Sequence, residues 1–210
     1  MIFYLNAMTI SFGKKIPLYQ TQVFDRTENK FKKATLSEFD CRDSEDIDYV
    51  ALQHDAWDFK YAISVDMFEK NRKLNNLGNI SSYDRQNLKN NRFFVLEDEK
   101  NEMLGLCETT GINQIFNVQY LESNKSKKVR FKFIGQNLLA GVSKQILSSE
   151  HKEPVLSVLD PAYTAVDFYR EKCGFKNVLN YSLKLEKDGL ADMVSSVEER
   201  VQTPLIDLNA

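Results

Sequence analysis

The most informative run of residues in this chain is Ala165-Val166-Asp167-Phe168-Tyr169-Arg170-Glu171-Lys172-Cys173-Gly174-Phe175. Counted from Ala162, its apolar residues recur at helical spacing along one stripe. Gly174 followed by Phe175 is typical of a left-handed helix stop with an apolar residue behind it. Upstream, Asp160-Pro161 offers a capping carboxylate and then the ring residue favoured at the first helical position. The run therefore predicts an amphipathic helix that begins near residue 160 and ends at residue 173.

Strands and a second helix are predicted before and after this run. Val155 to Leu159 is a compact β-type stretch directly before it, and a last strand is expected from about Val178 to Leu185. Earlier, Gly135 opens a helix in which four apolar residues share one face, namely Leu138, Leu139, Val142 and Ile146. This helix is expected to pack on a sheet.

The middle of the chain predicts a hairpin followed by a further strand. Two apolar runs, Arg92 to Leu96 and Met103 to Cys107, bracket a turn of charged residues. Ile115 to Leu121 then alternates apolar and polar residues, as expected of a strand with one wetter face. Residues 70–92 are rich in Asn, Lys and Ser, so we expect a connection or short helices there.

The N-terminal part is less regular. Short alternating runs within residues 1–34, such as Phe3 to Ile10, predict an arm or hairpin, and Ala34 to Phe39 predicts a short strand. Acidic residues around Ser44 suit the first turn of a helix over about 43–58. We expect three segments: an N-terminal arm or hairpin at 1–34, an α/β domain at 35–186, and a polar C-terminal tail at 187–210 with one short helix.

Composition argues against several classes of protein. The chain has 210 residues, 42% of them apolar, which is enough for one compact core. Its 28 basic residues nearly balance its 30 acidic ones, so nucleic acid is not the default partner. Cys41, Cys107 and Cys173 are odd in number and far apart, which indicates buried free thiols and a cytoplasmic setting. His54 and His151 stand near no other ligand at metal-binding spacing, so no metal site is predicted.

The sequence shows no sign of insertion into a membrane. Met1 to Leu5 is apolar, but it lacks a basic leader and Asn6 interrupts it, so we do not expect a signal peptide. Nowhere does an uncharged apolar stretch approach the roughly 18 residues that a membrane helix needs. The expectation is a soluble protein.

The order of elements and two motifs resemble the GNAT N-acetyltransferases. The stronger motif is the run from Ala165 to Phe175, which is similar to the family's A-x-x-F-Y-x-x-x-G-F segment. The weaker is Lys132 to Leu139, where the family has Gln or Arg, two residues, Gly, one residue, then Gly or Ala; Lys132 and Asn137 depart from it. The likeness covers roughly residues 92–185. It implies an α/β (α+β) fold, a GNAT-like mixed, mostly antiparallel sheet flanked by helices, with residues 35–186 as the acetyltransferase domain.

The resemblance also implies an acetyl-CoA site, and elementary physics supports its loop independently. Successive N–H groups at the start of a helix lack intrahelical partners and attract phosphate oxygens, which suits the pyrophosphate of CoA. In the family a strand splays from its neighbour, and its backbone would face the thioester. The predicted cofactor-binding residues are Val118, Tyr120, Lys132, Phe133, Ile134, Gly135, Gln136 and Asn137. Four nearby basic residues either reach the 3′-phosphate or form a solvated loop: Lys125, Lys127, Lys128 and Arg130.

Two residues are predicted to be catalytic, Tyr169 and Glu108. Tyr169 would donate a proton to the departing thiolate, as the matching tyrosine does in many family members; the alternative is a core aromatic. A phenol with a pKa of about 10 stays protonated at working pH. Glu108 is preferred to Glu122 as the base, although either can be an ordinary surface carboxylate. Cys107 has no activating neighbour, so a buried thiol is favoured over a nucleophile.

These observations predict an acyltransferase that moves an acetyl group from acetyl-CoA to a primary amine by direct attack. The acceptor stays open among a small amine, a peptide or lysine amine, and the aminoacyl group of a charged tRNA. Acidic residues at 40–48 either suit a cationic acceptor or are ordinary first-turn residues of a helix. Two other hypotheses stay open: a catalytically degenerate GNAT-like CoA-binding or protein-interaction module, and a nucleic-acid-binding protein acting through residues 125–132.

Overall fold

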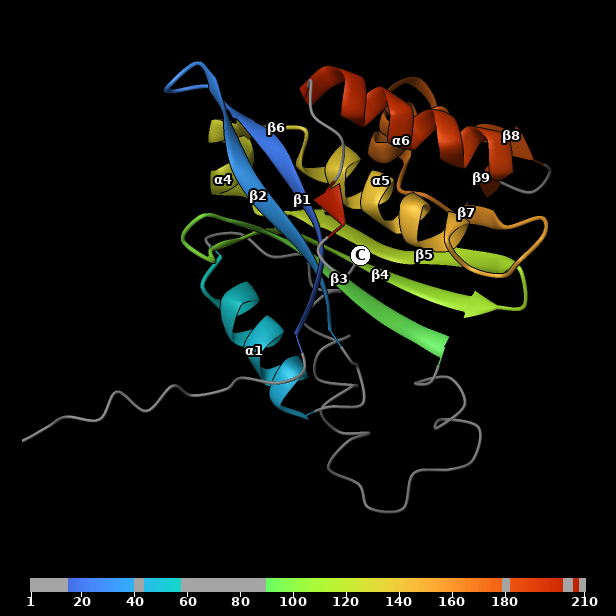
Figure 1. The fold of residues 1–210 in the computed structure, drawn as a ribbon, viewed down its shortest axis with the longest axis horizontal. Helices are drawn as coiled ribbons and strands as arrows, with labels where there is room; N and C mark the ends of the chain where they lie inside the picture. The colour runs from blue at the N-terminus through green and yellow to red at the C-terminus, as the bar shows by residue number, and fades with distance from the viewer. Residues whose placement is uncertain (1–14, 40–43, 58–89, 179–181, 202–205, 208–210) are drawn as a thin grey trace, which may run out of the picture.

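One twisted sheet dominates the computed structural model, which describes residues 15–39, 44–57, 90–178, 182–201 and 206–207 (Figure 1). The described residues form a 10-stranded sheet. Its strands stand in the order β10-β1-β2-β3-β4-β5-β7-β9-β8, and β6 pairs with β1.

The first five strands form an antiparallel meander. They are β1 (Ile16–Asp25), β2 (Lys30–Phe39), β3 (Asn91–Asp98), β4 (Met103–Ile112) and β5 (Ile115–Ser123). Asn29, Asn101 and Asn113 have positive φ and lie in the turns of three hairpins. Asn tolerates this left-handed conformation better than most residues, so each turn has a local cause.

The C-terminal strands bring in the parallel pairing. β7 (Val155–Leu159) lies parallel to β5, whereas β9 (Ser182–Leu185) and β8 (Lys176–Val178) are antiparallel to their neighbours. Two short strands, β6 (Phe131–Lys132) and β10 (Ile206–Asp207), pair with β1. The predicted α/β fold with a mixed, mostly antiparallel sheet is confirmed.

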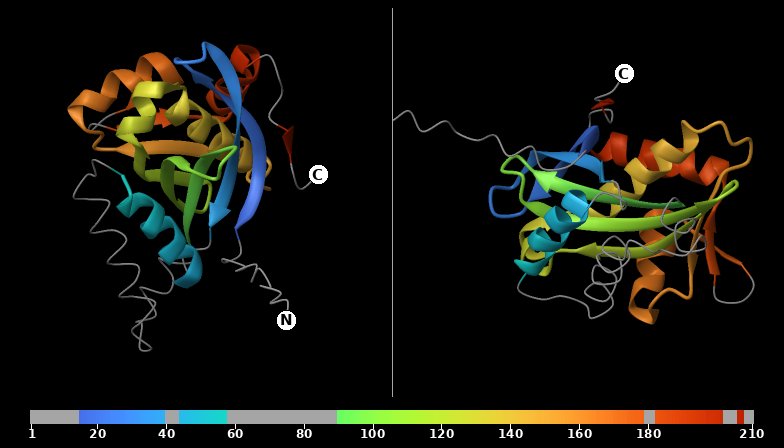
Figure 2. Two further views of the ribbon diagram at one scale, coloured as in Figure 1. Left: turned by 90° about the vertical axis from the view of Figure 1, so that its left-hand side faces the viewer. Right: turned by 90° about the horizontal axis from the view of Figure 1, so that it is seen from below.

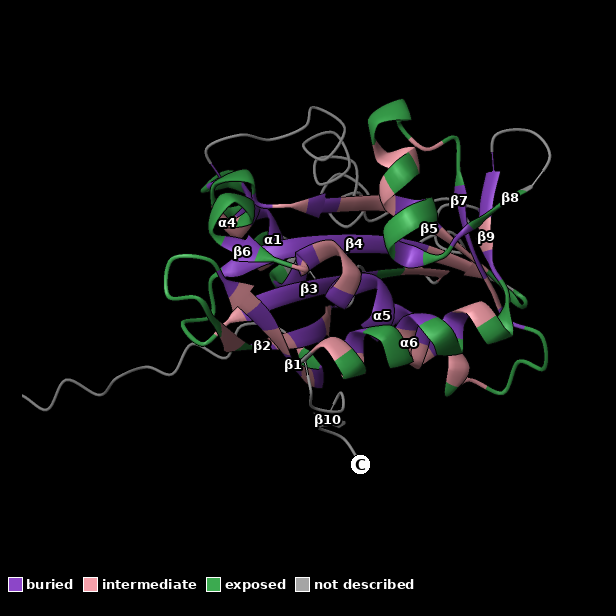
Figure 3. Cartoon of the chain, turned by 90° about the horizontal axis from the view of Figure 1, so that it is seen from above, coloured by how far each residue is buried: buried purple, intermediate pink, exposed green. Residues whose placement is uncertain are grey.

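Helices cover both faces of this sheet. α5 (Ile134–Leu147) and α6 (Lys187–Val201) lie on one face, and α1 (Ser44–Asp55) lies on the other (Figures 1 and 2). Leu138 and Leu139 of α5 are fully buried in the large core, and α5 is mostly purple in Figure 3. A smaller core forms on the α1 face around Trp57.

Three predicted elements differ from the structure. The helix expected from Asp160 begins later, with η1 (Tyr163–Ala165), because Asp160 adopts a left-handed conformation (φ 47°) outside the helix. The strand expected over 178–185 is replaced by β8 and β9, which pair with each other. The tail holds a longer helix than expected, α6, because its apolar residues Leu190, Met193 and Val197 are buried in the large core.

The described residues do not divide at the predicted segment boundaries. The boundary between residues 34 and 35 falls inside β2, and the β1–β2 hairpin belongs to the common sheet. The boundary at 186 separates α6 from the core to which it contributes. The run from Phe3 to Ile10 and almost all of residues 70–92 lie outside the described residues.

Two of the three cysteines lie in the part of the chain that the structure describes. Cys107 and Cys173 are buried free thiols, as predicted. Of the helices that the structure describes, none combines the length and the apolar character needed to cross a bilayer. No group of three or more His, Cys, Asp or Glu side chains in these ranges comes together as a metal site.

Candidate functional site

The sheet opens where β5 and β7 part. Their parallel pairing ends at Val118 and Val158, and β5 continues as far as Ser123. On its other edge, β5 pairs with β4 through a register shift beside Glu108, which leaves Gln119 as an extra residue. Such a β-bulge bends the strand and redirects its backbone groups. Beyond Val118, β5 therefore continues without pairing to β7, and the bulge at Gln119 lies next to this point.

A cavity of about 1130 Å³ lies at this opening. Its walls come from the end of β5, from the segment that leads into α5, and from the helix after β7. The lining residues are Arg26, Leu121, Glu122, Ser123, Lys125, Lys128, Val129, Phe131, Lys132, Phe133, Ile134, Gly135, Gln136, Thr164, Ala165, Phe168, Tyr169 and Lys172. Pockets for small molecules usually measure roughly 300–1,000 Å³, so this cavity is large enough for an extended ligand.

The first turn of α5 forms part of the cavity wall. Phe133, Ile134, Gly135 and Gln136 all line the cavity. The helical hydrogen-bond ladder starts with Asn137 N donating to Phe133 O at 2.9 Å, so the N–H groups of the three residues between them precede it. The positive end of the helix dipole adds to their attraction for phosphate oxygens. The wall of the cavity therefore includes a helix start whose first N–H groups lack intrahelical partners.

Phe133 begins α5 in a strained conformation. Its φ of 74° and ψ of 13° are left-handed, which costs a bulky residue roughly 1–3 kcal/mol. The chain before it is held by β6, which pairs with β1 through Phe24–Lys132 and Asp25–Phe131. Pairing to a separate strand thus fixes the approach to the strained residue.

Gly135 is explained by the close approach of another helix. A Cβ at this position would lie 2.9 Å from Cζ of Phe168, whose ring occupies the space of a side chain. Any larger residue would push this ring aside. The glycine therefore lets the helix after β7 pack closely against the start of α5.

A short helix, α4 (Lys125–Arg130), forms another wall of the cavity. Lys125 and Lys128 of α4 line the cavity together with Lys132 of β6. α4 is largely exposed, as its green colour in Figure 3 shows. These three ammonium groups make this wall positively charged, as an anionic ligand requires.

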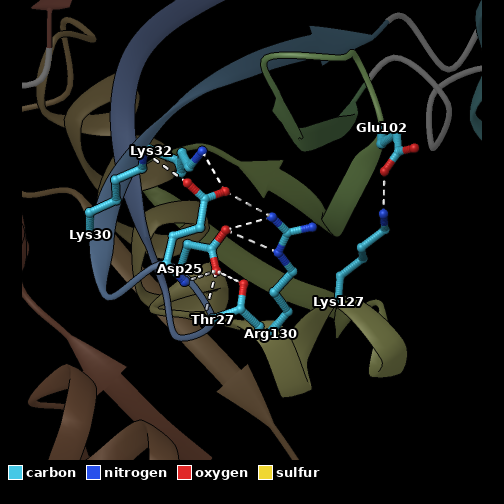
Figure 4. A network of polar contacts seen from close by, with 8 residues as sticks. Asp25, Thr27, Lys30, Lys32, Glu102, Lys127 and Arg130 are labelled. Atoms are coloured by element: carbon cyan, nitrogen blue, oxygen red, sulfur yellow. Dashed lines mark hydrogen bonds and ion pairs between the residues drawn. The ribbon is translucent and has the colours of Figure 1, made fainter.

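Lys127 and Arg130, the other two basic residues predicted to reach the 3′-phosphate, form ion pairs with acidic residues of the protein (Figure 4). Arg130 donates to the buried carboxylate of Asp25 through Nη2 at 2.7 Å and Nε at 3.0 Å, and Lys127 pairs with Glu102. The hydrogen bond from Arg130 holds the pKa of the Asp25 carboxyl well below its ordinary value. These contacts fasten α4 to the β1–β2 and β3–β4 hairpins.

Tyr169 lines the cavity from η2 (Phe168–Lys172), in the helix after β7. Its side chain is buried and packs edge-on against Phe168 and Phe175, with ring centroids 5.3 and 5.4 Å away. Burial raises the pKa of the phenol above its ordinary value, so the hydroxyl stays protonated and able to donate. Tyr169 thus belongs both to the apolar core and to the cavity wall.

The helix around Tyr169 is of the rare π type, and the sequence explains why. Four residues separate Tyr169 from Gly174, whereas three separate the matching residues of the family segment. This chain therefore carries one additional residue between the tyrosine and the glycine. A π-turn takes up one residue more than an α-turn, and the helix still ends at Gly174 with φ 75°. The extra residue comes after Tyr169, so Tyr169 keeps its register with Ala165 and Phe168, which also line the cavity.

Three predicted cofactor-binding residues are not among the lining residues. Val118 is buried in the large core, and Tyr120 packs against the smaller core on the α1 face. Asn137 is buried too: its Nδ2 donates to the backbone oxygen of Gln22 at 2.9 Å, and its Oδ1 accepts from Thr21 Oγ1 at 2.8 Å. Asn137 therefore ties α5 to β1, which gives a structural reason for its departure from the family pattern.

Two buried carboxylates lie on the α1 side of the opening. Glu108 is opposite Tyr120 in the β4–β5 ladder and shares a strand face with Leu106, and its Oε1 accepts from Asn91 Nδ2 at 2.9 Å. Glu122 lines the cavity and accepts a hydrogen bond from the Tyr120 hydroxyl. Neither is the surface carboxylate that the sequence left as an alternative, since they are 6% and 4% exposed.

The fold brings His54 to the same place, although no pattern in the sequence points to a role for this residue. Its Nε2 lies 2.9 Å from Glu122 Oε2, and its ring packs 4.7 Å from that of Trp57. His54 and Glu122 are 68 positions apart, on α1 and β5. No local pattern could have revealed this pair.

Comparisons with known proteins bear on the fold. No family model and no curated protein matches the sequence. A structure from Desulfovibrio desulfuricans described as a GNAT-family acetyltransferase is similar, with a TM-score of 0.50, 10% identity, and coverage of 73% of this chain and 99% of that one. A structure of the spermidine/spermine N-acetyltransferase of Vibrio cholerae is similar with a TM-score of 0.47 and 16% identity, and the match covers 76% of this chain and 96% of that one. For the ribosomal-protein-S18-alanine N-acetyltransferase of Escherichia coli the TM-score is 0.46 and the identity 12%, and the match covers 73% of this chain and 92% of that one.

Proposed function

We propose that this chain, which has the fold of the GNAT acetyltransferases, moves an acetyl group from acetyl-CoA to a primary amine. The observation that carries the proposal is the cavity at the splay of β5 and β7, because three groups with complementary chemistry meet there. They are the N–H groups at the start of α5, the lysines of α4, and the protonated phenol of Tyr169.

The donor fits this arrangement from end to end. The N–H groups of Ile134, Gly135 and Gln136 take the pyrophosphate, and Lys125 and Lys128 take the 3′-phosphate. The pantetheine arm lies along the end of β5, in the place where a further strand would otherwise pair. The thioester then reaches the bulge at Gln119.

The chemistry is direct attack. The amine nitrogen forms a bond to the carbonyl carbon, and a backbone N–H near Gln119 stabilises the oxyanion. The carbon–sulfur bond then breaks, and the thiolate takes the phenolic proton of Tyr169. Glu108, directly or through water, accepts the proton that the amine loses.

The acceptor enters from the α1 side of the sheet. Buried Glu108 and Glu122 give that side a negative character, which favours a cationic amine. A charged tRNA is less favoured, because acidic partners already neutralise Lys127 and Arg130 of the basic run. We therefore favour a small or peptidic amine as acceptor.

The test is calorimetric titration with acetyl-CoA, followed by a thiol-release assay with a panel of amines. Micromolar binding together with amine-dependent release of CoA supports the proposal. Binding without release across the panel favours a non-catalytic CoA-binding module. Lack of binding overturns the proposal.

A further inference from the structure

The last turn of α6 touches the residue that starts α5. Cζ of Arg200 lies 4.4 Å from the centroid of the Phe133 ring. Phe133 is the left-handed residue before the three N–H groups of the candidate anion site, and it lines the cavity. The contact therefore joins the C-terminal helix to the phosphate-facing turn, although the two residues are far apart in sequence.

The aromatic ring is what holds the guanidinium in place. Nη1 of Arg200 is buried and has no hydrogen-bond partner among the residues that the structure describes. Nη2 reaches Ser196 Oγ at 3.4 Å, a long hydrogen bond. A planar guanidinium stacks favourably on an aromatic face, more strongly where water is excluded. The ring of Phe133 is thus the main partner of Arg200.

We propose that Arg200 is a positioning residue for the anion-binding turn: by packing on Phe133, it holds this residue in its left-handed conformation. A phenylalanine at positive φ is disfavoured, and relaxation would rotate the peptide groups that open α5. β6 fixes the chain before Phe133, and Arg200 fixes its side chain. With both restraints the N–H groups of Ile134 to Gln136 are set for phosphate before a ligand arrives. The inference rests on the proposed function, since the phosphate is that of CoA.

A double-mutant cycle with CoA as the titrant tests this role. Arg200→Met keeps the length of the side chain but loses the planar cation, and it should weaken CoA binding roughly 3- to 30-fold. Phe133→Gly removes the ring and adopts positive φ without strain. In that background, Arg200→Met should change the affinity less than about twofold. A role confined to the packing of α6 would instead give the same loss in both backgrounds.

Two further variants keep the test decisive. Arg200→Lys keeps the charge without the planar group and should resemble Arg200→Met; it replaces Arg200→Met in the cycle if that variant does not fold. Lys144→Met is the matched control. Nζ of Lys144 on α5 lies 5.4 Å from the centroid of the Tyr19 ring, and neither residue lines the cavity. It should leave the affinity for CoA unchanged.

The outcomes separate this inference from the function on which it rests. Binding of CoA by the unmodified chain with undiminished affinity in Arg200→Met overturns the positioning role alone. Equal losses in the two backgrounds overturn it as well. Failure of the unmodified chain to bind CoA overturns the proposed function, and this inference with it.

Discussion

His54 of α1 and Glu122 of β5 form a buried pair, with Nε2 of the histidine 2.9 Å from Oε2 of the glutamate. The same carboxylate accepts a hydrogen bond from Tyr120 and lies at the wall of the cavity. The pair therefore connects the helix on one face of the sheet to the place where the sheet opens.

Replacement of His54 by Ala should lower the free energy of unfolding by about 3–5 kcal/mol, because buried Glu122 loses a hydrogen-bond partner and the missing ring leaves a cavity beside Trp57. His54→Gln, which keeps a donor, should lose less. Urea denaturation followed by circular dichroism measures both values. If the free energy of unfolding of the His54→Ala variant lies within about 1 kcal/mol of that of the unmodified chain, the contact contributes little. Breaking a buried pair usually costs more than that.

Replacement of Tyr169 by Phe should lower kcat roughly 100-fold, the lower range for the loss of a general acid, while the Kd for acetyl-CoA stays nearly unchanged. The ring packing with Phe168 and Phe175 survives the change. Tyr163→Phe is the matched control, since Tyr163 belongs to the same helical segment but is 92% exposed. Equal turnover in the two variants would remove the acid role of Tyr169.

Replacement of Lys125 and Lys128 together by Ala should weaken binding of CoA several-fold and leave binding of 3′-dephospho-CoA almost unchanged. Both lysines line the cavity, and their attraction for a phosphate weakens as salt is added. Lys127→Ala is the control, because Lys127 pairs with Glu102. Calorimetry at low and moderate salt measures these affinities. An equal loss for the two ligands would place the 3′-phosphate elsewhere.

Replacement of Asp25 by Asn should lower the melting temperature by several degrees at pH 7, because Arg130 loses a buried carboxylate. The pKa of Asp25 is lowered in the folded state by its hydrogen bond from Arg130. The stabilisation is therefore complete above the ordinary pKa of about 4 and is lost as pH falls toward the lowered value. Melting curves between pH 7 and pH 2 should show the two proteins converging below pH 4. A constant difference down to pH 2 contradicts this account.

Much of the fold follows from local patterns in the sequence. The alternation at 115–121 predicts most of β5, the run at 155–159 predicts β7, and Gly135 predicts the start of α5 to within one residue. The predicted stop at Gly174 is confirmed by its φ of 75°. These features depend on conformational preferences and side-chain periodicity over a few residues, which a sequence displays directly.

Residues of the candidate site were predicted less evenly, for a physical reason. Lys132 to Gln136 lie on one continuous turn, so they reach the cavity together. Asn137, one residue further, points away from the cavity and bonds to Gln22 and Thr21 of β1. No local pattern in the sequence associates Asn137 with this strand. The polarity of α6 concealed its buried face in the same way, because Leu190, Met193 and Val197 become buried only when the helix packs on the large core.

The sequence by itself determined α1, α5, the hairpin of β3 and β4, and the glycine-opened turn, because each is favoured by neighbouring residues whatever the rest of the chain does. The tertiary structure decided where β5 leaves β7, that Gln119 forms the bulge, that His54 meets Glu122, and that Arg200 covers Phe133. These contacts join residues far apart along the chain, and their energies arise only when packing brings the partners together and excludes water.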